Sequence, residues 1–183
     1  MDASFDLAPV YRELGAREVD LVRTHLLRLG RNSRTMRFGY AVSDEFIENY
    51  CSAVRRLNIM TFGALVDGEL RAVAELRRVS DARPADAEVA LSVEDAWQDD
   101  GIGTRLLSHV RRSARYHGIA TLHMICLREN YRMRCIAQKY RARTKTLADQ
   151  IGADAPRADL DCLPVASEWR ADKAGFVTFA LDV

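Results

Sequence analysis

The sequence predicts a mixed α/β (α+β) domain with a mostly antiparallel central sheet of about six to seven strands and helices on both faces. Two β-rich segments, residues 59–66 and 69–79, flank Asp67 and Gly68, the dipeptide most typical of a tight hairpin. Residues 87–127 have the pattern strand, helix, strand, and such a crossover joins parallel strands. Apolar residues at helical spacing precede both units and supply helices to cover the sheet.

The N-terminal part is predicted to form a short strand and two helices. Residues 11–14 form the opening strand, and residues 18–29 carry apolar side chains at helical spacing up to Gly30. Residues 31–40 are basic and polar and are interpreted as a connection. Ser43 is the expected N-cap of the next helix. The apolar stripe of that helix consists of Phe46, Ile47, Tyr50, Val54 and Leu57.

In the remainder of the chain, segments with the pattern of strands alternate with segments that have the apolar spacing of helices. Residues 80–86 are expected to be a loop, and residues 149–170 are the least regular stretch. The expected elements are a strand at 87–93, a loop at 97–103, a helix at 104–117, a strand at 119–127, a helix at 129–140 and a strand at 175–183.

The composition is that of a folded globular chain. Of its 183 residues, 48% are hydrophobic and 29% charged, and 27 Lys and Arg against 26 Asp and Glu give a net charge of +1. We expect one domain over residues 1–183, because domains contain about 100–200 residues. No uncharged stretch reaches the length of about 18 residues that a membrane-spanning helix requires, and residues 1–6 lack a secretory pattern.

The cysteines indicate a reducing compartment. Cys51, Cys126, Cys135 and Cys162 form no Cys-x-x-Cys pair. A metal site and a disulfide framework are therefore not expected, and we predict reduced thiols in a cytoplasmic protein.

Charge is distributed unevenly along the chain. Residues 99–145 contain 11 Lys and Arg and 3 Asp and Glu, whereas residues 146–183 contain 3 and 7. Most of these side chains are expected to be solvated, but the basic segment also suits a polyanionic ligand. Nucleic-acid binding by this basic segment is the less favoured hypothesis, because the segment contains no recognised nucleic-acid-binding motif.

The segment most informative about chemistry is residues 98–104, Gln-Asp-Asp-Gly-Ile-Gly-Thr, between a predicted strand and a predicted helix. Its two glycines permit close approach of a ligand to the backbone, and the helix N-terminus offers unpaired N–H groups. The segment therefore suits a phosphate or pyrophosphate. No Lys follows Gly103, which excludes a Walker loop, and Leu106 stands where a dinucleotide fingerprint needs a small residue.

The spacing Gln98-x-x-Gly101-x-Gly103 resembles the pyrophosphate loop of the GNAT acetyltransferase family. Residues 91–93 resemble that family's central strand, and Asn130-x-x-Met133 resembles the opening of its fourth helix. The nearest motif detail is that of bacterial protein-lysine acetyltransferases. The resemblance extends over residues 59–140 and implies a GNAT fold, in which the central strand carries a β-bulge and splays from its parallel neighbour.

The resemblance implies acetyl-CoA as co-substrate and no metal. The backbone at Leu91 and Val93 would hold the pantetheine and the acetyl carbonyl, residues 98–104 would wrap the pyrophosphate, and Asn130 would contact the CoA arm. The expected cofactor-binding residues are Leu91, Val93, Gln98, Asp99, Asp100, Gly101, Ile102, Gly103, Thr104, Asn130 and Met133.

Glu88 is the candidate catalytic base, because transfer to an amine requires the amine to lose a proton. It lies in the segment Ala-Glu-Val-Ala at the start of the predicted central strand, as in the bacterial lysine acetyltransferases that the sequence resembles. Glu75 on the neighbouring strand is the second candidate. Ala137 occupies the position where many family members have a tyrosine acid, so no general acid is assigned.

We therefore predict an N-acetyltransferase that moves the acetyl group of acetyl-CoA to a primary amine, possibly to a protein lysine. The alternative is a non-catalytic acyl-CoA-binding or regulatory module on the same fold, which the acidic residues Asp99 and Asp100 and the absent tyrosine favour. The expected partner is an amine acceptor, with a homodimer allowed and no membrane.

Overall fold

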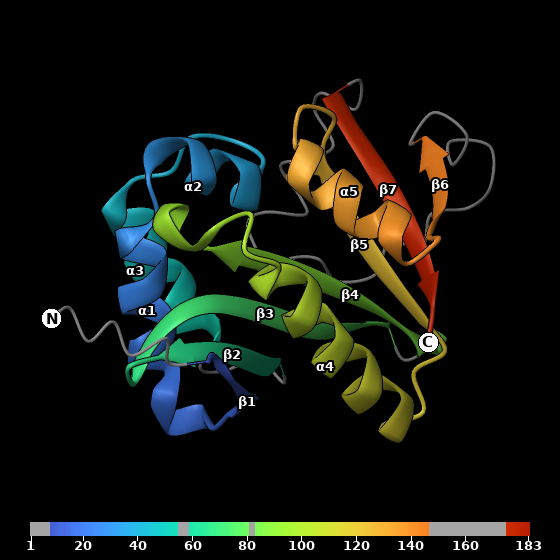
Figure 1. Ribbon diagram of the computed structural model, residues 1–183, viewed down its shortest axis with the longest axis horizontal. Coiled ribbons are helices and arrows are strands. Elements are labelled where there is room, and N and C mark those ends of the chain that lie inside the picture. Colours follow the sequence, from blue (N-terminus) through green and yellow to red (C-terminus); the bar gives the residue numbers. More distant parts are fainter. Residues whose placement is uncertain (1–7, 55–58, 81–82, 147–174) are drawn as a thin grey trace, which may run out of the picture.

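A computed structural model describes residues 8–54, 59–80, 83–146 and 175–183. Within these ranges seven strands form one sheet in the order β1-β2-β3-β4-β5-β7-β6 (Figure 1). The strands are β1 (Val10–Leu14), β2 (Met60–Val66), β3 (Glu69–Ser80), β4 (Arg83–Val93), β5 (Thr121–Leu127), β6 (Arg143–Thr146) and β7 (Phe176–Asp182). The helices are α1 (Val19–Arg28), α2 (Arg31–Phe38), α3 (Asp44–Val54), α4 (Ile102–Tyr116) and α5 (Tyr131–Lys139), with short 3-10 turns at Ala16–Glu18 and Asp95–Trp97.

The sheet confirms the predicted fold class. All described strand pairs are antiparallel except β4 with β5. The hairpin between β2 and β3 turns at Asp67 and Gly68, whose φ angles of 52° and 75° match a primed turn. The crossover from β4 through α4 to β5 produces the parallel pair, as the chain order requires.

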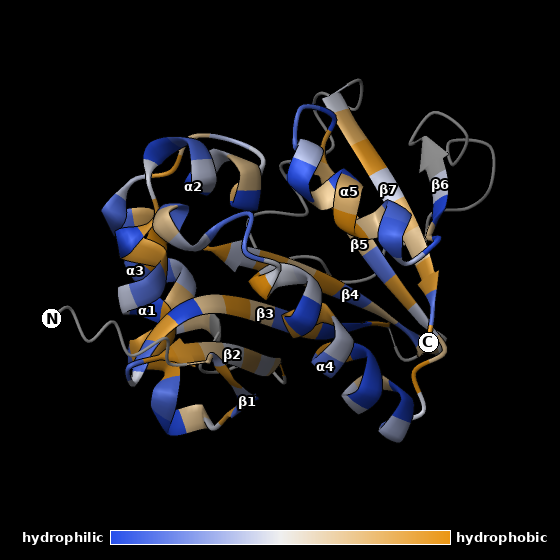
Figure 2. Ribbon diagram, in the orientation of Figure 1, coloured by the Kyte–Doolittle hydropathy of each residue, from blue (hydrophilic) through white to orange (hydrophobic). Residues whose placement is uncertain are grey.

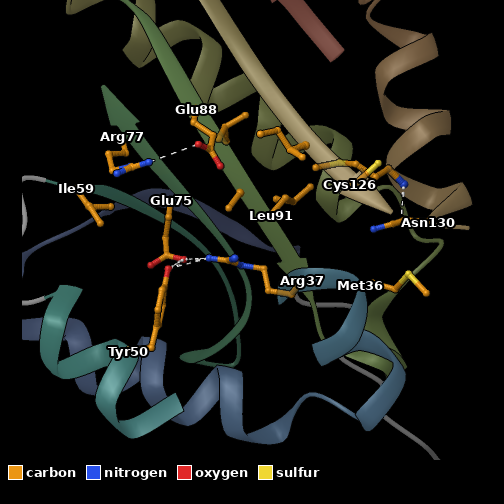
Figure 3. A pocket seen from close by; sticks show the side chains of 14 residues that line it. Met36, Arg37, Tyr50, Ile59, Glu75, Arg77, Glu88, Leu91, Cys126 and Asn130 are labelled. Carbon is orange, nitrogen blue, oxygen red and sulfur yellow. Dashed lines mark hydrogen bonds and ion pairs between the residues drawn. The ribbon is translucent and has the colours of Figure 1, made fainter. Parts of the chain in front are cut away.

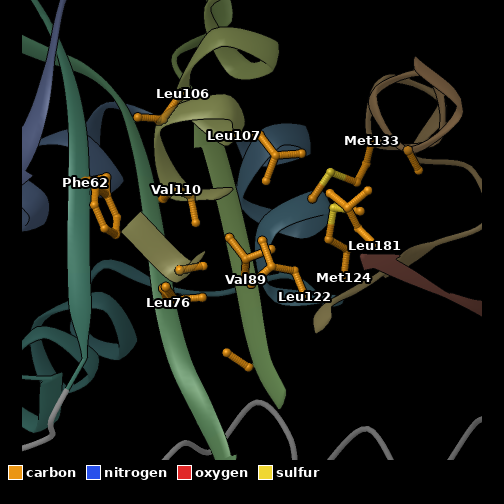
Figure 4. Packing of buried hydrophobic residues seen from close by; sticks show 14 of the residues in the cluster. Phe62, Leu76, Val89, Leu106, Leu107, Val110, Leu122, Met124, Met133 and Leu181 are labelled. Atoms are coloured by element: carbon orange, nitrogen blue, oxygen red, sulfur yellow. The ribbon is translucent and has the colours of Figure 1, made fainter. Parts of the chain in front are cut away.

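Two apolar clusters hold the helices on opposite faces of the sheet. One contains side chains of α1, α2 and α3 with Leu70 and Val73 of β3. The other joins the buried face of α4 and part of α5 to strands β2 to β5 and β7, and Figure 4 shows Leu106, Leu107 and Val110 of α4 in it. Figure 2 shows α4 orange toward the sheet and blue toward solvent, so its amphipathic pattern determines its place.

The parallel strands separate soon after they meet. Pairing of β4 with β5 covers only Asp86 to Glu88 and Thr121 to His123, although β4 runs on to Val93 and β5 to Leu127. Figure 1 shows the two strands joined near the C-terminus and diverging toward α2 and α5. This is the splay that the resemblance implied, and it opens the middle of the sheet.

Two local expectations about the central strand need correction. The pairing of β3 with β4 runs in unbroken register from Ala72 with Val93 to Arg78 with Ala87, and its irregularity lies beyond, between Arg78 and Ser80. The splay therefore arises without a bulge at residues 91–93. In addition, β4 already begins at Arg83, where the sequence suggested a loop, because it extends the ladder with β3.

Residues 31–40, expected to be a connection, form helix α2 instead. The segment is polar and buries only Phe38, so hydrophobic periodicity does not reveal it. Contacts from elsewhere stabilise it: Asp95 accepts hydrogen bonds from Gly30 N–H and Ser33 Oγ, and Arg34 donates to backbone carbonyls before the helix. Gly39, with φ of 82°, ends it.

The other helix boundaries follow the sequence closely. Ser43 caps α3, because its Oγ accepts a hydrogen bond from Phe46 N–H. Strand β6 was not predicted, and the irregular stretch at 149–170 lies outside the described residues. No helix among the described residues is long and apolar enough to cross a membrane.

Candidate active site

Two cavities meet where β4 and β5 separate. The larger has a volume of about 420 Å³ and the smaller about 50 Å³. Both are lined by Met36 and Arg37 of α2, Leu91 of β4, and Asn130 and Met133 at the start of α5. A ligand in one cavity therefore lies next to a ligand in the other, with Leu91 at the junction.

The wall of the larger cavity contains most of the predicted cofactor-binding residues. From that set it includes Leu91, Val93, Gln98, Asp99, Gly101, Ile102, Gly103, Thr104, Asn130 and Met133. Asp100 is not among the lining residues. Asn32 and Ser33 of α2 also line the cavity, and sequence reasoning missed them because α2 was taken for a connection.

The backbone of β4 directs hydrogen-bonding groups toward the opening. Ala120 N–H donates to the carbonyl of Ala85, so the odd-numbered residues of β4 direct their N–H and C=O groups toward β5. Because the pairing ends at Glu88, Leu91 and Val93 present backbone groups to the cavity rather than to a strand. These are the two residues whose backbone the resemblance assigned to the ligand.

The loop before α4 has the geometry expected of an anion site. Asp99 and Gly101 adopt φ angles of 69° and 77°, and no side chain caps the helix at Gly101. The first helical N–H groups of α4 therefore point out of the helix end without intrahelical partners, at the positive end of its dipole. Gly103 permits close packing, since a Cβ there would lie 3.3 Å from both Ile136 Cδ1 and Leu91 Cδ2.

Gln98 uses its side-chain amide to brace the loop. Its Nε2 donates to the carbonyl of Val93 at 2.9 Å and to Ser33 Oγ at 3.0 Å. The side chain thus ties the end of β4 to α2 and satisfies a carbonyl at the splayed edge. Because Nε2 donates to groups of the protein, it is not available to a phosphate.

The first aspartate of the loop, Asp99, is paired with an arginine of α5. Arg132 on α5 binds Asp99 with Nε to Oδ1 at 3.0 Å and Nη2 to Oδ2 at 2.8 Å. Hydrogen bonding from Arg132 holds the pKa of Asp99 below its usual value, so the carboxylate remains charged but paired. Asp99 therefore spans from the loop to α5 instead of pointing into the helix N-terminus.

Asn130 serves the helix as well as the cavity. Its Oδ1 accepts a hydrogen bond from Met133 N–H at 3.1 Å, which makes it the N-cap of α5. Ala137, where family members often have tyrosine, is fully buried in the core. Tyr140, three residues later, donates its hydroxyl to the carbonyl of Thr104 at 2.8 Å and holds α5 against α4.

The smaller cavity lies on the α2 and α3 side of β4 and contains two carboxylates (Figure 3). Glu88 is a quarter exposed, at 25%, and its Oε2 lies 3.6 Å from Arg77 Nη2. Glu75 is buried, and its Oε2 accepts hydrogen bonds from Arg37 and from Tyr50 Oη. Burial raises the pKa of Tyr50, so the phenol stays protonated and donates to Glu75.

A buried polar network fixes the end of β4 against α1. His25 Nε2 lies 2.9 Å from Ser92 Oγ, and His25 Nδ1 lies 3.3 Å from Glu94 Oε1. Arg28 and Arg71 also donate to Glu94. Although burial opposes it, hydrogen bonding from His25 and the two arginines lowers the pKa of Glu94 to about 2. Burial lowers the pKa of His25 and favours its neutral form.

Together the splayed sheet, the anion-binding loop and the two adjoining cavities define a domain that brings two ligands together at one point of a strand. The sequence model of the Acetyltransferase (GNAT) family matches residues 28–139, more than half of the chain. The chain belongs to this family of acetyltransferases. No curated protein matches the sequence significantly.

Solved structures share the fold at low sequence identity. The GNAT domain of PAT from S. lividans superposes with a TM-score of 0.69 at 19% identity, covering 96% of this chain and 90% of that one. A PaiA N-acetyltransferase from Thermoplasma acidophilum in complex with coenzyme A gives 0.63 at 15%, covering 97% and 100%. A ribosomal-protein-alanine N-acetyltransferase from Brucella melitensis gives 0.60 at 12%, covering 95% and 98%.

Proposed function

We propose that this protein transfers the acetyl group of acetyl-CoA to a primary amine, with Glu88 as general base. The observation that carries the proposal is the meeting of the two cavities at Leu91, where β4 has left β5. One cavity has an anion-binding loop, and the other has carboxylates. Acetyl transfer needs both environments side by side.

The residues of the larger cavity fit acetyl-CoA. Backbone N–H groups at the start of α4 suit the pyrophosphate, and the free edge of β4 at Leu91 and Val93 suits the polar groups of the pantetheine arm and the acetyl carbonyl. Coenzyme A is bound in the solved PaiA structure, and this supports the same ligand here. Acetyl-CoA supplies the activated acyl group.

The proposed reaction is a direct transfer between two bound substrates. Glu88 removes a proton from the acceptor ammonium, and the resulting amine attacks the thioester carbonyl. The C–N bond forms, the C–S bond breaks, and the thiolate leaves and takes up the second proton that the nitrogen loses as it becomes an amide. Thiol pKa values lie near about 8.5, so the departing group does not depend on a dedicated acid. This agrees with the burial of Ala137 in the core.

We propose a lysine side chain, presented by a protein, as the acceptor. The small cavity has a volume of about 50 Å³, and Met36 and Arg37 of α2 form part of its wall. The fold is shared with a ribosomal-protein-alanine N-acetyltransferase, whose acceptor is a protein, and this supports a macromolecular acceptor here. The single domain over residues 1–183, the cytoplasmic location and the homodimer stay predictions.

A thermal-shift titration with acetyl-CoA, with NAD as comparison, tests the co-substrate. Ligand at 100 times its dissociation constant stabilises the folded state by about 2.7 kcal/mol, which corresponds to about 5–10 °C for a domain of this size. We expect that shift with acetyl-CoA and none with NAD. Absence of any shift at millimolar acetyl-CoA would contradict the proposal, and a shift without transfer to any amine would favour the acyl-CoA-binding module.

A further inference from the structure

The smaller cavity contains a buried carboxylate oxygen that is left without a donor. Glu75 is 5% exposed, and its Oε2 receives the hydrogen bonds from Arg37 and Tyr50. Its Oε1 has no hydrogen-bond partner within the part of the chain that the structure describes. Leaving a buried acceptor unsatisfied is costly, so this oxygen points to a ligand that donates a hydrogen bond.

The position of Glu75 is fixed by contacts from four other elements. Its strand pairs it with Ala90 on β4 and Thr61 on β2, while Arg37 comes from α2 and Tyr50 from α3. Figure 3 shows these two side chains converging on Glu75 from below the sheet, with Glu88 on the adjacent strand. Because Arg37 and Tyr50 hold Oε2 in place, the carboxylate cannot turn freely, and among the described residues no donor reaches Oε1. This oxygen is therefore open to a donor from a ligand.

The surroundings define which donor fits. Arg37 balances the charge of Glu75, and Arg77 lies near Glu88, so the cavity offers hydrogen-bond acceptors without a large excess of negative charge. The rest of the wall includes the apolar side chains of Met36, Ile59 and Ile125. A small cavity whose wall combines apolar side chains with carboxylates suits an alkyl chain that ends in an ammonium group.

We infer that Glu75 Oε1 accepts a hydrogen bond from the ammonium group of the acceptor and holds it beside Glu88, and that the cavity selects unbranched primary alkylamines. This inference rests on the proposed acetyl transfer and names its substrate class. Glu75 binds and orients the amine, and Glu88 takes the proton. The two carboxylates lie at diagonal positions of neighbouring strands, on the same face of the sheet, and line the same cavity.

The test compares amine binding and kinetics in Glu75→Gln, Glu75→Asp and the control Glu69→Gln. Glu69 lies on the same strand, is exposed and pairs with Arg71 outside the cavity. Calorimetry with n-butylamine and with Nα-acetyllysine measures binding without acetyl-CoA. We expect about tenfold or greater weakening in both Glu75 variants, and a matching rise in KM for the amine, because a charge-assisted hydrogen bond is lost or misplaced. The control stays within about twofold of the wild type.

A branched amine tests the shape of the cavity. In the wild-type protein, tert-butylamine should bind at least about tenfold more weakly than n-butylamine, since the quaternary carbon beside its nitrogen is wider than a methylene chain and keeps the nitrogen from approaching the carboxylates. Equal binding of the two amines would overturn the assigned substrate class.

Two further results separate this inference from the proposed function. If the wild type acetylates amines and a folded Glu75→Gln binds n-butylamine as tightly as the wild type, the inference is wrong and the proposed function stands. If the wild type acetylates no amine, the proposed function fails. Where Glu75→Gln does not fold, Glu75→Asp decides, because it keeps the charge opposite Arg37 and withdraws the oxygen by one methylene.

Discussion

The two cavities differ in how their walls are assembled. The largest share of the wall of the larger one is contiguous, from the end of β4 through the following loop to the first turn of α4, and the rest comes from α2 and α5. The polar groups of the smaller one come from separate elements, among them Arg37 of α2, Tyr50 of α3, Glu75 of β3 and Glu88 of β4. The anion site of the larger cavity uses backbone N–H groups, whereas the carboxylates of the smaller cavity are paired with other side chains.

The difference shows which parts of a bisubstrate site depend on the sequence near them. A loop that binds phosphate through backbone N–H groups needs glycine at particular positions, and tolerates other side chains if they point away, as Asp99 does. A site for an amine needs carboxylates at fixed places, and each of these requires partners from elsewhere in the chain. The acceptor wall is therefore the more sensitive one to single changes.

The largest expected effect is on the acceptor side. Glu88→Gln should lower kcat about 10²- to 10⁴-fold, because the amide cannot take the proton of the amine. The dissociation constant of acetyl-CoA should stay unchanged, since Glu88 lies outside the larger cavity. Steady-state kinetics and calorimetry measure the two quantities, with Glu69→Gln as control. A kcat equal to that of the wild type removes Glu88 as the base.

The second prediction concerns Glu94, which ties the end of β4 to α1 and β3. The pKa of Glu94 is lowered from 4.5 to about 2 in the folded protein. A carboxylate with a lowered folded pKa stabilises the protein fully above its unfolded pKa and loses that contribution as the pH falls toward the folded value. The shift corresponds to about 3 kcal/mol.

Urea unfolding of the wild type and Glu94→Gln tests this contribution. We expect the variant to be less stable by about 3 kcal/mol at pH 7, and the gap to narrow as the pH falls from 4.5 toward 2. A difference that stays constant between pH 7 and pH 3 would show that Glu94 acts by shape and not by charge.

The third prediction concerns Gly101, in the loop that lines the larger cavity. Gly101→Ala places a Cβ on a residue with φ of 77°, although the space around it is open. Gly118→Ala, with φ of 71° and equally open space, is a matched control at the far end of α4. Both should lose about 1 kcal/mol of stability, because alanine is strained in this conformation.

Only Gly101→Ala should weaken acetyl-CoA binding, by about tenfold, since the strained loop no longer presents its N–H groups in place. Calorimetric titration with acetyl-CoA of both variants gives the answer. Equal affinities in the two variants would contradict an anion site at this loop.

The smallest expected effect belongs to Asp99. Asp99→Asn removes an exposed charge that pairs with Arg132, so the melting temperature should barely change. Acetyl-CoA should bind about threefold more tightly at low salt, because one negative charge leaves the cavity and Arg132 is released for a phosphate. Asp100→Asn, which changes a residue outside the lining set, is the control. Weaker binding in Asp99→Asn would mean that the pair with Arg132 holds the loop in its binding shape.

Features that depend on residues close together in the chain could be predicted from the sequence. The Asp67 and Gly68 turn, the cap at Ser43, the parallel pair of β4 and β5 and the loop at 98–104 all follow from spacing and backbone preference. The two glycines of the loop were recognisable because the left-handed conformation at Gly101 and the close contact at Gly103 each exclude most side chains.

The wall of the smaller cavity, proposed to bind the acceptor amine, could be recognised only in the tertiary structure. Helix α2 has too little apolar surface for its period to be visible, and it folds because Asp95, Glu75 and backbone carbonyls satisfy its polar side chains. The sequence marked Glu75 as a lesser candidate base, but its free oxygen becomes evident only once Arg37 and Tyr50 are seen to occupy the other. Such an arrangement depends on long-range packing, which local spacing does not record.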